Sequence, residues 1–345
     1  MSPAISTDTS TAPPARRARG RLLDVLAPAL PLARLAVMRR LISAFVVFDV
    51  LLVSNDVIGH AANPEYFRPT ALMRLLHLPA VTPVLGWGLL VVVLASGALG
   101  ALGRAPRASG GVLAVSFWTW MLYSQGYGYI SHDHVALMVA VAVLPTAGIA
   151  RTRADGLDAT DGLDATDGLD GADGAGRADR ADAAGAGVLS RQAGWALRCI
   201  QIAVVLTYFY SVLEKSVISG SPATWANSAV FAFAFIRRGA PWVQWMLDAP
   251  WLFRPAQWAL IVLETISPLA LFLRGRKLYA LIGVFLAFHL ATFVALGIHF
   301  LPTVVCWAAF LPLERIAARW RGRVRHRRAA RTGAAHPSRA EAGAE

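Results

Sequence analysis

Eight apolar segments dominate the pattern of hydrophobic and polar residues along the chain. They cover residues 41–58, 82–102, 110–128, 134–150, 196–213, 256–273, 278–297 and 301–314. An α-helix needs roughly 20 apolar residues to cross a bilayer, and several of these segments fall somewhat short of that length. The pattern predicts an all-α protein, a polytopic membrane helix bundle with about eight transmembrane spans.

Two stretches depart from this regular pattern. The last segment is short and is bounded by Pro302 and Pro312, which favours a tilted or partly re-entrant span. Residues 222–236 are apolar but too short for a span. They are expected either to lie along the membrane surface or to dip into the bundle.

Residues 151–190 divide the chain into two halves. The sequence Asp-Gly-Leu-Asp-Ala-Thr begins at Asp155 and at Asp161, with a third start at Asp167, and the rest is mostly Ala, Gly, Asp and Arg. This segment has too little apolar surface for a core and lacks the terminal glutamate of a calcium-binding EF-hand. It predicts a disordered cytoplasmic linker. The remaining regions are transmembrane half-bundles at 36–150 and 191–314, a basic N-terminal tail at 1–35 and a basic, disordered C-terminal tail at 315–345.

Composition and charge place the chain in the membrane class. Hydrophobic residues make up 56% of it and charged residues only 16%, whereas a soluble domain has about 25% charged residues. The net charge is +12, and the cations lie mainly in tails and loops beside apolar segments. Anionic lipid headgroups are therefore the expected partner, and nucleic acid is not. Basic loops stay on the cytoplasmic side, which predicts that both termini are cytoplasmic.

A lysine closes the fifth apolar segment. Lys215 follows Tyr208 by seven residues and Gln201 by fourteen, so an α-helix places all three on one stripe. A polar stripe on an apolar helix faces a protein interior or a wet cavity, and an ionisable residue at membrane depth is a candidate for function. Burial disfavours the charged form of a lysine, and a neutral amine accepts protons. Lys215 is either a general base or a side chain that snorkels to the headgroups.

Other polar groups are candidates for the same chemistry. Three polar residues, His132, Asp133 and His134, lie at the start of the fourth segment. They are candidates for a proton relay, a metal site or a helix cap. Glu264 lies inside the sixth segment, where a carboxylate must be neutral or paired, and it either orients a reacting group or ties helices together. His289 lies deep in the seventh segment, as a core residue or as a proton carrier.

A second polar stripe is expected in the first segment, where Asp49, Asp56 and His60 are spaced at i, i+7 and i+11. Packing and a substrate path are equally open for it. Cys199 and Cys306 lie in apolar runs and are interpreted as packing residues. The chain has no phosphate-binding glycine loop and no nucleophile elbow, so nucleotide-driven and hydrolase functions are not supported. It also has no zinc motif, so no metal is expected.

The second half of the chain resembles the HTTM (horizontally transferred transmembrane) domain family, which includes vitamin K-dependent γ-carboxylase. The segment from Tyr208 to Lys215 is similar to a family segment that begins Tyr-Phe and ends in the lysine base. The chain departs from the family at Glu214 and Ala226, where the family has lysine and glycine. The resemblance covers about residues 36–314, and its other similar positions are Asp133-His134, Trp225, Glu264, Phe288-His289-Leu290 and Gly297-Ile298-His299-Phe300.

The resemblance implies a bacterial membrane enzyme that couples quinol oxidation to proton abstraction. Lys215 would be the base, and the assisting residues would be His134, His289 and Glu264. The implied cofactor is a quinone or quinol of the vitamin K type, held near Tyr208, Trp225 and His299. The implied substrate is a peptide or a small molecule.

Two alternatives remain open. Small bacterial relatives of the SdpB type help to mature secreted peptides, so the chain is alternatively a non-catalytic accessory in maturation or export. It is otherwise a proton-coupled transporter, whose relay would consist of Asp49, Asp56, Glu264 and His289.

Overall fold

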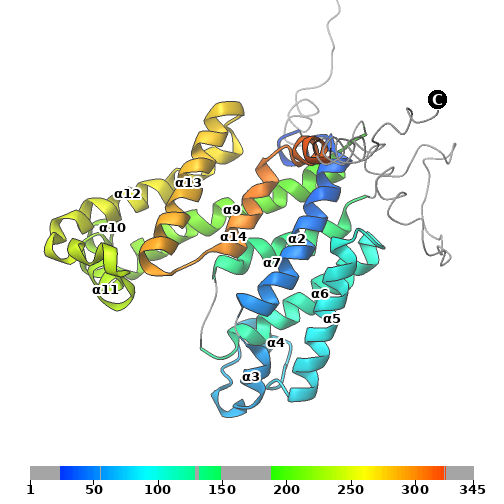
Figure 1. Ribbon diagram of the computed structural model, residues 1–345. Helices are drawn as coiled ribbons and strands as arrows, with labels where there is room; N and C mark the ends of the chain where they lie inside the picture. The colour runs from blue at the N-terminus through cyan, green and yellow to red at the C-terminus, as the bar shows by residue number, and fades with distance from the viewer. Residues whose placement is uncertain (1–23, 55, 129–131, 149–187, 322, 324–345) are drawn as a thin grey trace, which may run out of the picture.

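The computed structural model describes residues 24–54, 56–128, 132–148, 188–321 and 323 (Figure 1). About 80% of these residues are helical, which confirms the all-α class. The two strands in the described part are two residues long, and β1 (Leu30–Pro31) pairs antiparallel with β2 (Leu189–Ser190). Most of the predicted linker and tails lies outside the described residues, and there disorder stays a prediction. In the described part the prediction is wrong at two places: residues 313–321 form a helix that extends into the predicted C-terminal tail, and Leu189–Ser190 at the end of the predicted linker form β2.

Helices occur in all eight predicted apolar segments, and further short helices lie between them. The α-helices are α2 (Leu32–Leu52), α3 (Val57–Ala61), α4 (Ala71–Leu75), α5 (Pro83–Ala101), α6 (Pro106–Gln125), α7 (Val135–Val143), α9 (Arg191–Ile218), α10 (Pro222–Trp225), α11 (Ala229–Arg238), α12 (Phe253–Thr265), α13 (Gly275–Leu296) and α14 (Leu301–Cys306). The 3-10 helices are η1 (Pro64–Tyr66), η2 (His132–His134), η3 (Leu144–Thr146), η4 (Pro241–Asp248), η5 (Pro250–Leu252), η6 (Ser267–Leu271) and η7 (Trp307–Phe310).

Local sequence sets where several of these helices begin and end. Thr82 and Ser190 cap α5 and α9, because each hydroxyl accepts a hydrogen bond from a backbone N–H in the first turn. Gly297 ends α13 with φ of 64°, a left-handed conformation that glycine adopts without strain. The helix boundaries thus follow residue chemistry that is visible in the sequence.

Three helices in the described part of the chain, α5, α9 and α13, are long and apolar enough to cross a membrane. A fourth span is counted if 301–310 and 313–321, which are bent by 91°, form one broken span. The remaining predicted spans are shorter or more polar. Pro145 and Pro268 lie in the 3-10 turns that follow α7 and α12, and α2 contains three arginines and an aspartate. Prolines in helix interiors remove backbone hydrogen bonds, so these helices end early.

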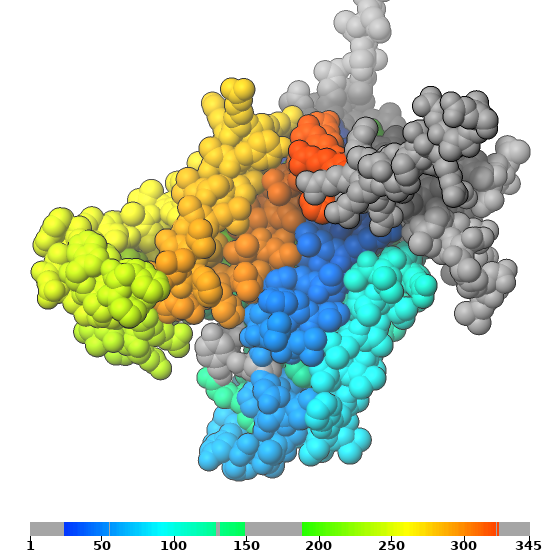
Figure 2. Space-filling model, in the orientation of Figure 1, coloured from blue at the N-terminus to red at the C-terminus, as the bar shows by residue number. Residues whose placement is uncertain are grey.

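The first half is a bundle of α2, α5, α6 and α7 (Figure 1). Gly97 of α5 lets that helix approach α2 closely, since a Cβ at this position would lie 2.7 Å from Cγ2 of Val47. The long helix α9 packs on α7 and continues into the second half, where it contacts α12. The segments from α10 to α12 form a lobe that projects from the rest of the molecule (Figures 1 and 2).

One end of the bundle, which we call the basic end, is held together by arginines. Arg34 donates two hydrogen bonds of 2.8 Å to the carboxylate of Glu314. Arg198 donates to the carbonyls of Val25 at 2.9 Å and Leu271 at 3.3 Å. The basic end therefore gathers the start of α2, the start of α9, the end of η6 and the residues after η7. It also shows that α2 begins within the segment predicted as the N-terminal tail.

Arg39 closes the C-terminal end of α7. Its buried guanidinium donates to the carbonyls of Leu144 at 2.8 and 3.0 Å, Ala147 at 2.7 Å and Gly148 at 3.2 Å. The last carbonyls of a helix have no partner within the helix, so a positive group with several donors stabilises this end. Arg39 thereby fixes α2 against the chain that leaves α7.

Replacing Arg39 by alanine should destabilise the folded protein, because several buried carbonyls lose their donor. We expect a loss of about 2–4 kcal/mol in the free energy of unfolding, since a buried unsatisfied polar group costs about 1–3 kcal/mol. Thermal unfolding of the purified protein in detergent measures this loss. Arg104→Ala is the matched control, as Arg104 is exposed. Equal melting temperatures for the two variants would contradict the role given to Arg39.

Candidate functional site

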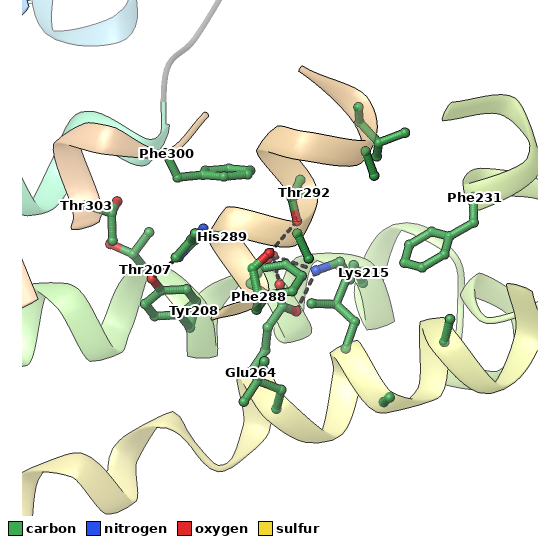
Figure 3. A pocket seen from close by; sticks show the side chains of 18 of the residues that line it. Thr207, Tyr208, Lys215, Phe231, Glu264, Phe288, His289, Thr292, Phe300 and Thr303 are labelled. Carbon is green, nitrogen blue, oxygen red and sulfur yellow. Dashed lines mark hydrogen bonds and ion pairs between the residues drawn. The ribbon is translucent and has the colours of Figure 1, made fainter. Parts of the chain in front are cut away.

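A cavity of about 590 Å³ lies among α9, α12 and α13, with further walls from α11 and α14 (Figure 3). Most of its surface is apolar, from alanine, leucine and phenylalanine side chains. The polar groups that line it are His132, Thr207, Tyr208, Ser211, Lys215, Glu264, His289, Thr292 and Thr303. An apolar pocket with a few convergent polar groups is the usual form of a small-molecule site.

The charged part of the cavity is an ion pair between α9 and α12. The ammonium of Lys215 lies 2.5 Å from Oε2 of Glu264 and donates to Oγ of Ser211 at 2.7 Å. Ser211 in turn donates to Oε1 of Glu264 at 3.3 Å. The side chains of Lys215 and Glu264 are 16% and 9% exposed, so the pair is largely withdrawn from solvent. Lys215 also lies 5.0 Å from the ring centre of Trp225, within the range of a cation–π contact.

Helical spacing explains the arrangement of this pair. Ser211 lies four residues before Lys215 on α9, so both side chains project from the same face. Glu264 is the penultimate residue of α12, shortly before the chain tightens into η6. Glu214 is exposed and takes no part in the pair, as the spacing of about 100° per residue requires.

A second polar pair lies beside the first and joins α9 to α13. The hydroxyl of Tyr208 is 2.5 Å from Nε2 of His289, and Nε1 of Trp307 donates to the same hydroxyl at 3.1 Å. Nδ1 of His289 is buried and has no hydrogen-bond partner among the described residues. If the hydroxyl donates to Nε2, the neutral imidazole holds its proton on Nδ1. This unpaired polar atom belongs to a side chain that lines the cavity.

The stripe predicted on α9 faces the protein interior. Gln201 donates to the carbonyl of Ala309 at 2.8 Å, Tyr208 contacts His289, and Lys215 pairs with Glu264. One face of α9 therefore contacts η7 through Gln201, α13 through Tyr208 and α12 through Lys215. Snorkelling of Lys215 to lipid headgroups, the alternative interpretation, is contradicted by its pairing with a carboxylate inside the protein.

His134 lies in a separate cluster. Its Nε2 is 3.1 Å from Oδ1 of Asp49 and its Nδ1 is 3.1 Å from Oδ1 of Asp133. Asp49 and His134 are both buried, and neither lines the cavity. The neighbouring His132 does line it. The structure thus divides the predicted cluster: His132 faces the candidate site and His134 binds two carboxylates behind it.

The second predicted stripe, Asp49, Asp56 and His60, is not formed. Helix α2 ends at Leu52, so the helical spacing that would align these residues is interrupted. Asp56 instead caps α3 by accepting a hydrogen bond from the N–H of Ile58. His60 stacks on the ring of Tyr127, with centroids 4.2 Å apart. A continuous polar path through these three residues is therefore absent.

Two residues predicted to hold a cofactor do not line the cavity. Trp225 contacts the ammonium of Lys215 but does not line the cavity. His299 is in the turn after α13, is not a lining residue, and has a buried Nδ1 without a partner among the described residues. Tyr208, by contrast, lines the cavity directly.

Sequence reasoning missed several lining residues. Ser211 had a detectable signal, because it lies one turn before Lys215 on the same helix. Phe231, Phe288 and Phe300 come from three separate elements and form the aromatic walls (Figure 3). Their apolar side chains are indistinguishable in sequence from lipid-facing ones, so only the fold assigns them. No group of His, Cys, Asp and Glu side chains in the described ranges is arranged to hold a metal ion.

Comparison of the chain with protein-family models, with curated proteins and with solved structures gave no match. The interpretation of the site consequently depends on its own geometry.

Removing only one partner of the ion pair should destabilise the protein. Glu264→Leu leaves the ammonium of Lys215 buried beside apolar groups, with an expected loss of about 2–3 kcal/mol, because an unpaired buried charge is costly. Lys215→Met combined with Glu264→Leu should recover most of this loss, since neither charge remains. Thermal unfolding in detergent compares the variants, with Glu214→Leu as the exposed control. A double variant as unstable as Glu264→Leu would show that the two side chains are not coupled.

Proposed function

We propose that this chain is an integral membrane protein of the HTTM type that binds a quinone or quinol and moves a proton at Lys215. The observation that supports this most directly is the Lys215–Glu264 pair, which lines one side of a mainly apolar cavity. Isolated ion pairs at membrane depth are costly to maintain and are associated with function. The similarity of Tyr208 to Lys215 to the lysine-base segment of the family suggests the chemistry.

The proposed topology has eight spans in a bacterial cytoplasmic membrane. Each of the eight apolar segments contains a helix, although only α5, α9 and α13 meet the length and hydropathy of a full span. The gathering of basic connections at one end supports a single cytoplasmic face, where lysine and arginine are retained. Both termini and residues 151–190 are assigned to that face. The short helices α10 and α11 are assigned to the opposite side.

The cavity suits an amphiphilic ring compound. A quinol would supply two acidic hydroxyl groups and the electrons of the proposed oxidation. Phe231, Phe288 and Phe300 provide flat apolar walls for its ring. Lys215 and the unpaired Nδ1 of His289 provide polar atoms for its oxygens. The residues present therefore fit the group that the resemblance implies.

The proton step starts from the ion pair. The ammonium of Lys215 donates to Glu264, and transfer of that proton to Oε2 produces a neutral amine and a neutral carboxylic acid. The exchange conserves net charge, which suits a site withdrawn from water. The neutral amine then accepts a proton from a group in the cavity, while Ser211 holds both partners in place. In this mechanism Lys215 is the base, and Glu264 makes its amine available by accepting the ammonium proton.

Proton-coupled transport is the second candidate. The Asp49–His134–Asp133 cluster favours it, because Asp49 and His134 are buried together beside the partly buried Asp133, and Oδ2 of Asp49 has no partner in the described part of the chain. Asp56 is excluded from that relay by its role as a helix cap. Uptake of a solute driven by a pH gradient across proteoliposomes would distinguish this function from quinol chemistry.

The test of the main proposal uses the purified protein and its Lys215 variants. Mass spectrometry of protein extracted in mild detergent should identify a bound quinone. Quinol oxidation with dioxygen as electron acceptor, followed by absorbance, should fall about 100-fold or more in both Lys215→Ala and Lys215→Arg, a typical loss for a missing base. Arginine keeps the charge but does not release a proton near neutral pH.

The same variants separate the base from a merely structural lysine. Lys215→Arg should retain bound quinone at a level near that of the original protein, whereas its oxidation rate falls. A Lys215→Arg protein with full oxidation activity would exclude lysine as the base. Activity that survives Lys215→Ala in a peptide-maturation assay would instead support the non-catalytic accessory role.

Cysteine labelling tests the proposed topology. In a background without Cys199 and Cys306, Arg104→Cys should react with a membrane-impermeant maleimide only after the cells are opened. Ala62→Cys should react in intact cells. Both positions are exposed in the folded chain, so a lack of reaction reflects sidedness and not burial. Labelling of Arg104→Cys from outside would overturn the assignment of the basic end to the cytoplasm.

A further inference from the structure

Small residues border the cavity on two neighbouring helices. Ala259 of α12 and Ala291 of α13 both line the cavity and are both exposed. A residue that lines a cavity and is exposed lies where the cavity meets the outside of the protein. In Figure 3 the site lies between the helix that holds Glu264, α12, and the helix that holds Phe288 and His289, α13. The two alanines thus mark an opening between α12 and α13.

This opening lies at membrane depth. Ala259 is six residues after the start of α12, and Ala291 is five residues before the end of α13. With a rise of 1.5 Å per residue, both lie about 8–9 Å along their helices from the end opposite the basic end. The side chains around them that point outward are apolar, namely Trp258, Val262, Leu290, Phe293 and Val294. Lipid chains, and not water, are the natural neighbours of this surface.

The aqueous end of the cavity is lined mainly by aromatic side chains. Phe231 and Phe235 of α11 line the cavity there, and Phe300 lies in the turn after α13. The ring of Phe300 is packed against His289, with centroids 5.1 Å apart. Aromatic side chains and the exposed imidazole of His132 therefore line the cavity toward the water, whereas the exposed lining residues toward the lipid are the two alanines.

We infer that the ligand reaches Lys215 and Glu264 sideways from the membrane, through a portal between Ala259 and Ala291. This inference rests on the proposed function and specifies its substrate class: a membrane-dissolved amphiphile with a polar head and a long apolar chain. The head occupies the side of the cavity that holds Lys215, Glu264 and His289. The chain passes between the two alanines into the lipid. A water-soluble peptide does not fit this route.

The test compares two azidoquinone probes, one with a long polyprenyl tail and one with a short tail. Photolysis attaches the ring of a bound probe to the protein, and mass spectrometry quantifies the adduct on cavity peptides. The full chain is reconstituted in lipid nanodiscs. The portal variant combines Ala259→Phe and Ala291→Phe. The control combines Val262→Phe and Leu290→Phe, which are exposed positions on the same helices that do not line the cavity.

The portal variant should lose labelling by the long-tailed probe about tenfold or more, equivalent to about 1.4 kcal/mol of binding. Labelling by the short-tailed probe should change much less, because its tail does not occupy the opening, and the control should match the original protein. Unchanged long-tail labelling in the portal variant would overturn the portal and leave the quinone site intact. Equal losses for both probes would also overturn it, since the new rings would then fill the cavity itself. Absence of labelling in the original protein would count against the proposed function instead.

Discussion

Polar side chains on one face of α9 must find partners inside the protein, and the second half of the fold depends on how they do so. At membrane depth no water is present to satisfy an amide, a phenol or an ammonium group. Gln201 therefore binds the backbone of η7, Tyr208 binds His289 on α13, and Lys215 binds Glu264 on α12. The order of these contacts along a single helix of 28 residues fixes which element lies beside which.

The way in which α13 packs on α9 accounts for the cavity. Helix α13 has few buried side chains, namely Ile282, Phe285 and His289, and its contact with α9 runs through the rings of Tyr208 and Phe285, whose centroids are 4.7 Å apart. Contacts through large side chains hold helices apart, whereas small residues such as Gly97 bring α5 against α2. Helices α2 and α5 consequently approach each other closely, whereas α9 and α13 leave a space beside the charged pair.

Much of the fold follows from the sequence, but the pairing of polar groups does not. The hydrophobic pattern predicted eight apolar segments, each of which contains a helix in the described part of the chain, and helical spacing placed Lys215 on the inner face of α9. The predicted stripe is wrong for Asp56 and His60, because helical spacing aligns side chains only within a continuous helix, and α2 ends at Leu52. The number of spans does not follow from hydropathy alone. Pro145 and Pro268 lie in the 3-10 turns at which α7 and α12 end, and charged residues lie within α2.

The separation of His132 from His134 shows why a site cannot be assembled from sequence neighbours. Both belong to η2, yet one side chain lines the cavity and the other binds Asp49 and Asp133. Within a 3-10 turn, successive side chains point in directions about 120° apart, so residues two positions apart diverge. Partners come from whichever helices pack on each side, here α2 for His134, and that packing is set by contacts far away in the chain.

The energetics of the Lys215–Glu264 pair argue that stability alone does not explain it. A partly buried ion pair gains little over a well-packed apolar pair, because removing both charges from water costs nearly as much as their attraction returns. Apolar side chains surround this pair, since Leu260, Leu263 and Phe288 line the same cavity. A bundle built only for stability would fill the cavity with such side chains. Two opposite charges retained at the wall of a mainly apolar space are what the proposed function requires, because that proposal needs a group that binds a polar head and exchanges a proton with it.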